Sequence, residues 1–349
     1  MNNTTISGTG ENTAGHILKN LGNLLEIDEQ GFEEEVRSRA REITRREFNG
    51  GVFVSGLLAV SNYCRNDCTY CGLRVSNANL PRFRLSLDDI RRASDSLRES
   101  GLDRIFFVSG EDRGFKVDDI LKMAAHAKGI GLHITIGMGI YPETILRELK
   151  DAGADCYTLK FETSNREMFE KIKPTADFDE RLQCIRAIKQ TGLEFGSGNN
   201  VGIEGQTLDD ISADILLMHE LGVDWAPVVP YLPAPGTPMA ETTPMGDVWL
   251  TLRELSLLRV LMPRTIITAG QPSQGSKLGF ADPDGNRAAL DAGANILFID
   301  ITPHAVRKNF TITPGRILPD LLPLENLLAS MGLERIRSKR ATNSSDKIT

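Results

Sequence analysis

The sequence predicts an α/β protein, and within that class a (β/α)8 TIM barrel, from three observations. Short apolar, β-branched runs alternate with longer stretches of helical period. Eight such runs occur, and strands separated by helices form parallel units that can close into a barrel. The first run leads into Ser61–Cys64 rather than a glycine-rich turn, and neither Gly137–Gly139 nor Gly196–Gly202 matches the dinucleotide-binding pattern. An open doubly wound sheet is therefore the weaker alternative.

The predicted strands and helices follow one another in regular order. Strands are predicted at Val52–Val60, Arg104–Val108, Leu132–Gly137, Cys156–Phe161, Glu194–Asn200, Trp225–Pro230, Thr265–Ala269 and Ile296–Asp300. Helices are predicted at Leu87–Ser100, Val117–Lys128, Pro142–Ala152, Phe178–Thr191, Thr207–Leu221 and Val248–Leu261. The glycines that suit a left-handed helix end are Gly101, Gly153, Gly192 and Gly222. The last predicted helix instead stops before Pro263, because proline cannot extend a helix.

The chain divides into a barrel and three flanking segments. Residues 1–15 are polar and are predicted to be a disordered N-terminus. Residues 16–50 form an N-terminal helical extension, with its helical stretch at about Asn23–Arg46, that we expect to pack outside the barrel. The barrel is predicted over residues 51–334, since no Pro/Ser/Gly-rich linker divides them, and residues 335–349 form a flexible basic tail.

Composition excludes several classes of protein. The 349 residues contain 40 Lys and Arg against 47 Asp and Glu, so the basic excess typical of a nucleic-acid-binding protein is absent. No apolar run approaches the ~20 residues that span a bilayer, and the N-terminus lacks the pattern of a secretory signal. Five cysteines, an odd number, do not indicate a disulfide framework. The predicted compartment is the reducing cytoplasm.

Three of the cysteines lie together after the first predicted strand, where Cys64, Cys68 and Cys71 form the pattern C-x3-C-x2-C. Thiolates this close can converge on one soft metal centre. Iron–sulfur clusters are held by such thiolates, normally by four, so three would leave one iron with an open coordination position. Structural zinc is the alternative, but zinc prefers four ligands, and no histidine or second cysteine pair lies near this loop.

This motif, with the aromatic Tyr70 directly before its last cysteine, resembles that of the radical S-adenosylmethionine (SAM) superfamily. The resemblance implies that Cys64, Cys68 and Cys71 are the catalytic, metal-ligating residues of a 4Fe-4S cluster whose open iron binds SAM. It implies an enzyme in which the reduced cluster cleaves SAM to methionine and a 5'-deoxyadenosyl radical that attacks a small substrate. The electron would come from a one-electron reductant such as ferredoxin or flavodoxin.

Two later segments also match cofactor-binding residues of that superfamily. Ser109, Gly110 and Glu111, after the second strand, resemble the segment that binds the SAM amino group, with its first glycine replaced. Glu162, at the end of the fourth strand, matches an acid that contacts SAM, and Arg181 matches an arginine that meets the SAM carboxylate. Without the resemblance, these residues would be interpreted as a common turn, half of an ion pair and a surface arginine.

Further site residues are predicted from the loops that follow the strands, where barrel enzymes place their chemistry. Asn199 lies in a glycine-rich segment that lets the backbone approach a ligand, so it is assigned to the cofactor. Lys160 shares a strand face with Glu162, and the resemblance leaves it for the substrate. Gln271, Thr302 and His304 follow the seventh and eighth strands and are predicted to contact the substrate, with ordinary loop turns as the alternative.

Within the superfamily, the chain is most similar to the subgroup of biotin synthase, methylornithine synthase (PylB) and the FeFe-hydrogenase maturase HydE. The segments most similar to HydE are Cys64–Leu73 continued through Arg82–Arg84, Phe161–Asn165 and Gly196–Thr207. The resemblance implies a role in hydrogenase cofactor maturation, with other maturation proteins as partners.

The chain also departs from HydE. Lys160 stands where HydE has an arginine, and lysine does not reproduce the planar guanidinium fork. The loops Gly270–Gly275 and Ile301–His304 are unlike those of HydE, and no cysteine follows Cys184 to bind a second cluster. The alternatives are a carbon-skeleton rearrangement like that of methylornithine synthase, a HydE paralogue with another substrate, and a non-catalytic iron–sulfur carrier.

Overall fold

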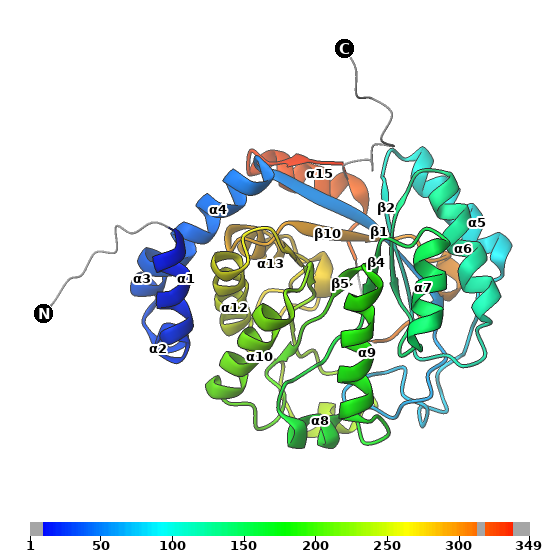
Figure 1. The fold of residues 1–349 in the computed structure, drawn as a ribbon, viewed down its shortest axis with the longest axis horizontal. Coiled ribbons are helices and arrows are strands. Elements are labelled where there is room, and N and C mark those ends of the chain that lie inside the picture. The colour runs from blue at the N-terminus through cyan, green and yellow to red at the C-terminus, as the bar shows by residue number, and fades with distance from the viewer. Residues whose placement is uncertain (1–9, 313–317, 338–349) are drawn as a thin grey trace, which may run out of the picture.

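The computed structural model describes residues 10–312 and 318–337, and its centre is a barrel of parallel strands (Figure 1). Its strands, in sheet order, are β10 (Ile296–Asp300), β1 (Gly51–Ser61), β2 (Arg104–Ser109), β3 (His133–Gly137), β4 (Cys156–Thr158), β5 (Glu194–Gly196), β7 (Trp225–Ala226) and β9 (Ile266–Ile267). A bridge between Thr268 and Ile296 joins β9 to β10. Backbone hydrogen bonds from Asn295 to Ile267 (2.9 Å) and from Ala269 to Ile296 (2.8 Å) complete this closure. The predicted barrel is confirmed.

Two of the predicted strands are interrupted. The fifth, Glu194–Asn200, forms β5 and then β6 (Asn200–Val201), and the sixth, Trp225–Pro230, forms β7 and then β8 (Val229–Pro230). β6 pairs with β8 in a separate two-stranded sheet. Pro227 has no N–H to donate to a ladder, which explains the break after β7.

Helices cover the outside of the barrel (Figure 1). They are α5 (Leu87–Glu99), α6 (Val117–Gly129), α7 (Glu143–Asp151), α8 (Arg166–Ile172), α9 (Phe178–Thr191), α10 (Leu208–Leu221), α11 (Pro238–Thr242), α12 (Val248–Leu261), η2 (Gly279–Ala281), α13 (Pro283–Asp291), α14 (His304–Arg307) and α15 (Leu321–Ser330). Capping boxes at Ser86 and Thr207 begin α5 and α10. Gly192 and Gly222 end α9 and α10 in the left-handed conformation, as predicted.

The N-terminal extension covers α12, which is buried along nearly its whole length (Figure 1). Its helices are α1 (Gly10–Lys19), α2 (Leu21–Glu26), α3 (Glu29–Phe32), the π-helical turn η1 (Glu33–Arg37) and α4 (Ser38–Phe48). The predicted stretch at Asn23–Arg46 is broken at Asp28, whose side chain caps α3 by accepting from the Gly31 N–H. Residues 1–15 are predicted to be disordered, but α1 begins at Gly10, so the last part of this segment is helical. Residues 1–9 lie outside the described residues.

The C-terminal part of the described chain returns to the beginning of the barrel. β11 (Glu334–Arg335) pairs in parallel with Gly51 and Val52 at the start of β1. The predicted tail 335–349 therefore begins inside a strand, and its residues 338–349 lie outside the described residues. Over the described ranges, no helix combines the length and apolar character needed to cross a membrane.

Candidate active site

A cavity of about 330 Å³ opens inside the barrel, at the end where the strands finish. It contains all three cysteines of the C-x3-C-x2-C motif. Its lining combines charged and polar side chains with aromatic and aliphatic ones. The charged residues are Glu111, Lys160, Glu162, Lys173 and Arg181.

The loop that holds the cysteines is fixed by its own polar contacts. Arg82 donates to the backbone carbonyls of Asn62 and Leu73 at 2.6 and 2.9 Å. The Asp67 carboxylate accepts two hydrogen bonds from Arg74, at 2.8 and 2.7 Å, and these hold its pKa well below the usual range. The loop is therefore ordered by contacts that do not use the thiols.

The loop also packs tightly against the end of β2. A Cβ atom at Gly110 would lie 2.3 Å from the Tyr63 carbonyl oxygen and 2.7 Å from the Cys64 Cβ. Only glycine fits at this position, which explains why the predicted segment after β2 keeps its second glycine.

The donor set fits an iron–sulfur cluster. Cys68 is buried, Cys64 and Cys71 are partly exposed, and none of them is in a disulfide. The described residues contain no group of three His, Cys, Asp or Glu side chains placed to hold a single metal ion, as zinc would require. Three thiols that line one cavity are the kind of donor set that holds an iron–sulfur cluster.

Two carboxylates face three cations beside the thiols. Glu111 lies 3.1 Å from Arg181. Glu162 has three partners, Lys173 at 3.6 Å and both Lys160 and Arg181 at 3.8 Å. Burial acts to raise the pKa of each carboxyl, but the nearby cations outweigh it and the pKa of both stays below the usual value. Both carboxylates are therefore charged and available to a cationic ligand.

The backbone of Glu162 has an unusual conformation, with a φ of 71°. Among the described non-glycine residues, only Glu162 and Asn49 have a positive φ. Its N–H donates to the Gly198 carbonyl at 3.1 Å, and its own carbonyl accepts from the Asn200 N–H at 3.1 Å. Strain of this kind persists where the surroundings fix it, and it is concentrated at functional sites. Here it directs the side chain of Glu162 towards the cations.

Most of the predicted cofactor residues lie together in this cavity. Glu111, Glu162 and Arg181 are joined by the ion pairs above, and Tyr70, Ser109, Gly110 and Lys160 line the same cavity. Among the lining residues that sequence reasoning missed, Lys173 and Asn200 contact the predicted Glu162. Lys173 follows a short helix that the pattern did not predict, and nothing in the sequence separates it from the exposed Lys171.

Asn199, predicted from its glycine-rich segment to contact the cofactor, does not line this cavity. Its side chain is fully buried and donates to Asp214 on α10 at 3.0 Å, whereas the neighbouring Asn200 lines the cavity. Asn200 accepts from Lys160 at 2.8 Å and donates to Glu162 at 2.9 Å. Successive side chains of an extended segment point to opposite faces, and a glycine-rich stretch does not indicate which face is which.

Three predicted substrate residues also lie outside the cavity lining. Gln271 is fully buried and donates to the Val228 carbonyl at 2.8 Å. The Thr302 hydroxyl accepts from the Ala59 N–H at 2.9 Å. This bond holds the loop after β10 against β1, and His304 beyond it is exposed at the start of α14. Gln271 and Thr302 thus connect barrel segments, and the assumption that every strand-end loop faces the site does not hold here.

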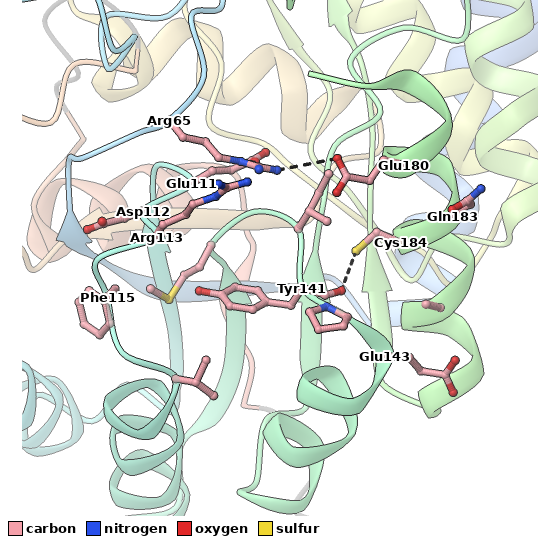
Figure 2. A pocket seen from close by; sticks show the side chains of 15 residues that line it. Arg65, Glu111, Asp112, Arg113, Phe115, Tyr141, Glu143, Glu180, Gln183 and Cys184 are labelled. Atoms are coloured by element: carbon pink, nitrogen blue, oxygen red, sulfur yellow. Dashed lines mark hydrogen bonds and ion pairs between the residues drawn. The ribbon is translucent and has the colours of Figure 1, made fainter. Parts of the chain in front are cut away.

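A second cavity, of about 540 Å³, lies between the loops after β2 and β3 and the helix α9 (Figure 2). Figure 2 shows Arg65 beside Glu111 and directed towards Glu180. Arg65 donates to Glu111 at 3.1 Å and lies 3.8 Å from Glu180. Cys184 also lines this outer cavity, and its thiol contacts the Tyr141 carbonyl at 3.5 Å. Glu111 borders both cavities, so it forms part of the wall between them.

Comparison with protein-family models matches residues 58–218 to the radical SAM superfamily. The match begins within β1 and ends within α10, so it includes the cysteine loop and all five charged cavity residues. The chain belongs to the radical SAM superfamily, whose members are enzymes that use a 4Fe-4S cluster and SAM.

Individual relatives agree with this family. The chain is 34% identical to the FeFe hydrogenase maturase subunit HydE of Thermotoga maritima, over 85% of this chain and 84% of that protein. It is 27% identical to 3-methylornithine synthase of Methanosarcina barkeri, over 82% of this chain and 79% of that one. The crystal structure of methylornithine synthase (PylB) matches with a TM-score of 0.81 at 24% identity, covering 94% of this chain and 97% of the other, and confirms the fold.

Proposed function

We propose that this radical SAM enzyme acts in FeFe-hydrogenase cofactor maturation, as HydE does, on a small substrate inside the barrel. The observation that supports the proposal is the 34% identity to HydE over most of both chains, against 27% for 3-methylornithine synthase. A one-electron reductant such as ferredoxin or flavodoxin and other maturation proteins would be its partners.

In this proposal, Cys64, Cys68 and Cys71 hold the 4Fe-4S cluster, with Tyr70 beside it. When bound, the cluster and SAM supply a 5'-deoxyadenosyl radical through one-electron cleavage of SAM. The apolar wall of the cavity keeps water away from the reacting atoms.

The charged residues orient SAM and the substrate. Glu111, with the backbone of Ser109 and Gly110, binds the SAM amino group, and Arg181 binds the carboxylate as a planar donor. Glu162 accepts hydrogen bonds from SAM. Lys160, which Asn200 and Glu162 hold at the cavity wall, donates to an anionic group of the substrate.

The first test is anaerobic SAM cleavage. The protein is reconstituted with iron and sulfide and given SAM and dithionite, and 5'-deoxyadenosine is quantified against Cys68→Ala. Cysteine-dependent product supports the assignment of the cluster. An intact cluster in the Cys68→Ala variant, with undiminished product, would contradict it.

The second test concerns the maturation role. The chain is expressed in a cell that makes an FeFe hydrogenase but lacks its own HydE, and hydrogen evolution is measured. We expect this chain to restore hydrogen evolution and the Cys68→Ala variant not to restore it. A protein that forms 5'-deoxyadenosine but restores no activity would refute the maturation role. Restored 3-methylornithine formation in a strain lacking that synthase would favour the alternative.

A further inference from the structure

The deep end of the reaction cavity is built from three aromatic rings. Phe106 and Trp225 meet edge to face with centroids 5.2 Å apart. Phe298 lies 6.1 Å from Phe106 and 5.7 Å from Trp225. All three line the cavity. Phe106 lies on β2, Trp225 on β7 and Phe298 on β10, and other strands separate these three in the sheet. We call this set of rings the aromatic floor.

The aromatic floor lies below the charged residues. The strands run towards the cavity mouth, so residues earlier in a strand lie deeper in the barrel. Phe106 precedes Ser109 along β2, at about 3.3 Å for each residue, and Glu111 follows the end of the strand. Thr158, at the level of the floor, likewise precedes Lys160 and Glu162. A substrate held by Lys160 would therefore extend its far end towards the rings.

Two glycines make room for the aromatic floor. A Cβ atom at Gly137 would lie 2.8 Å from the Phe106 ring and 2.7 Å from the Thr158 methyl group. A Cβ atom at Gly196 would lie 2.9 Å from the Trp225 ring. The rings are thus held closely by β3 and β5, and the floor has a fixed shape.

The aromatic floor offers no free hydrogen-bond donor to an anionic group. Its one polar atom that can donate, the Trp225 indole N–H, is already bonded to the Thr268 hydroxyl at 3.0 Å. The charged side chains of the cavity follow the ends of the strands and pair with one another. An anionic group placed on the rings would lose its hydration, find no free donor and meet the negative ring faces, which is strongly unfavourable.

We propose that Phe106, Trp225 and Phe298 select the substrate, and that the part of the substrate that reaches them is a short, uncharged hydrocarbon group. The inference rests on the proposed function in that the substrate enters this cavity and meets Lys160. It names a chemical class, a small molecule with an anionic end for Lys160 and an apolar end for the rings.

Trp225 itself can report the binding. The chain has two tryptophans, and the other, Trp249 on α12, stacks with Arg37 of the N-terminal extension and with Arg253 of α12. A Trp249→Phe background leaves Trp225 as the sole tryptophan. The reconstituted holoenzyme with SAM and no reductant is titrated with pentanoate and with glutarate, which has the same carbon chain but a second carboxylate in place of the methyl group. We expect pentanoate to change the Trp225 fluorescence with at least tenfold tighter binding than glutarate.

Variants of the aromatic floor test the size limit. The parent should bind pentanoate more tightly than heptanoate, because the rings stop a longer chain. Phe298→Ala should reverse that order. Phe298→Leu, which is less disruptive, should narrow the difference in affinity between pentanoate and heptanoate. Phe48→Ala is the matched control, since it removes a ring that packs on Phe53 and Arg259 outside the cavity. It should keep the parent's order.

Three results would overturn the inference: no Trp225 response to pentanoate, glutarate binding as tightly as pentanoate, or an unchanged chain-length order in both Phe298 variants. Failure of the maturation role is recognised separately. If hydrogenase activity is not restored but the probes behave as expected, the substrate class stands and the maturation role falls. If activity is restored and pentanoate gives no response, the inference about the aromatic floor falls alone.

Discussion

Glu162 combines a strained backbone with three cationic partners, and we predict that its charge is needed for SAM binding. Glu162→Gln keeps the shape of the side chain and removes the charge. Because a hydrogen bond to a charged group contributes about 1.5–3 kcal/mol, SAM affinity should fall about 10- to 100-fold. Equilibrium binding of SAM to the reconstituted protein measures the loss. Glu167→Gln, exposed on α8, is the control, and equal affinity in both variants would contradict the prediction.

The adjacent residues Asn199 and Asn200 should give opposite results. Asn200→Ala removes the side chain that bridges Lys160 and Glu162, so it should weaken SAM binding. Asn199→Ala leaves the buried Asp214 without one of its donors, so it should lower the free energy of unfolding by about 1–3 kcal/mol and leave SAM affinity unchanged. SAM titration and urea unfolding of both variants separate the two roles. A loss of SAM affinity only in Asn199→Ala would return Asn199 to the cofactor site.

At the scale of the elements, Asp214 connects α10 to the loops after β4 and β5. It accepts from the Ser164 N–H and hydroxyl, both at 2.6 Å, and from Asn199. Burial raises its pKa to about 6, and burial also raises the pKa of Glu254 on α12 well above the usual value. Asp210 adds to the rise for Asp214, and Lys160 opposes it for Glu254. The interface of α10 and α12 therefore favours protonated carboxyls.

This interface predicts a dependence of stability on pH. The folded state binds the Asp214 proton more tightly than the unfolded state, whose pKa is near 3.8, so stability falls as pH rises towards and through 6. Between pH 5 and 7 the group should account for a loss of about 1 kcal/mol. Urea unfolding at both pH values should show a smaller loss for Asp214→Asn, which mimics the protonated acid. An identical loss in the two proteins would show that Asp214 does not titrate in this range.

The elements also show what the sequence could predict and what it could not. The barrel followed from the alternation of apolar runs and helices, and the cysteine site from a ligand spacing that suits an iron–sulfur cluster better than zinc. The breaks after β5 and β7 were missed because a run of apolar residues does not show where the pairing partner changes. The side-chain direction of Asn199 depends on the register of an irregular segment, and that register is set by contacts far away in the sequence.

At the scale of the whole molecule, the extent of strand pairing differs around the barrel. β1 pairs with β2 and β10 along five residue pairs each, whereas β7 and β9 are two residues long and β9 meets β10 through an isolated bridge. Strands with few backbone hydrogen bonds open more readily. Amide hydrogen exchange followed by mass spectrometry should therefore be faster in residues 223–230 and 264–270 than in 52–60 and 104–109. Uniform protection around the barrel would contradict this expectation.

The pairing of β11 with the start of β1 determines how the protein can be attached to a surface. β1 has 11 residues, which at the usual rise span about 35 Å, and the cysteine loop follows its far end. A linker joined after residue 337 would therefore leave the barrel at the end opposite the cavity. Immobilised in this way, the enzyme would present its mouth to solution, where a soluble electron donor could reach it.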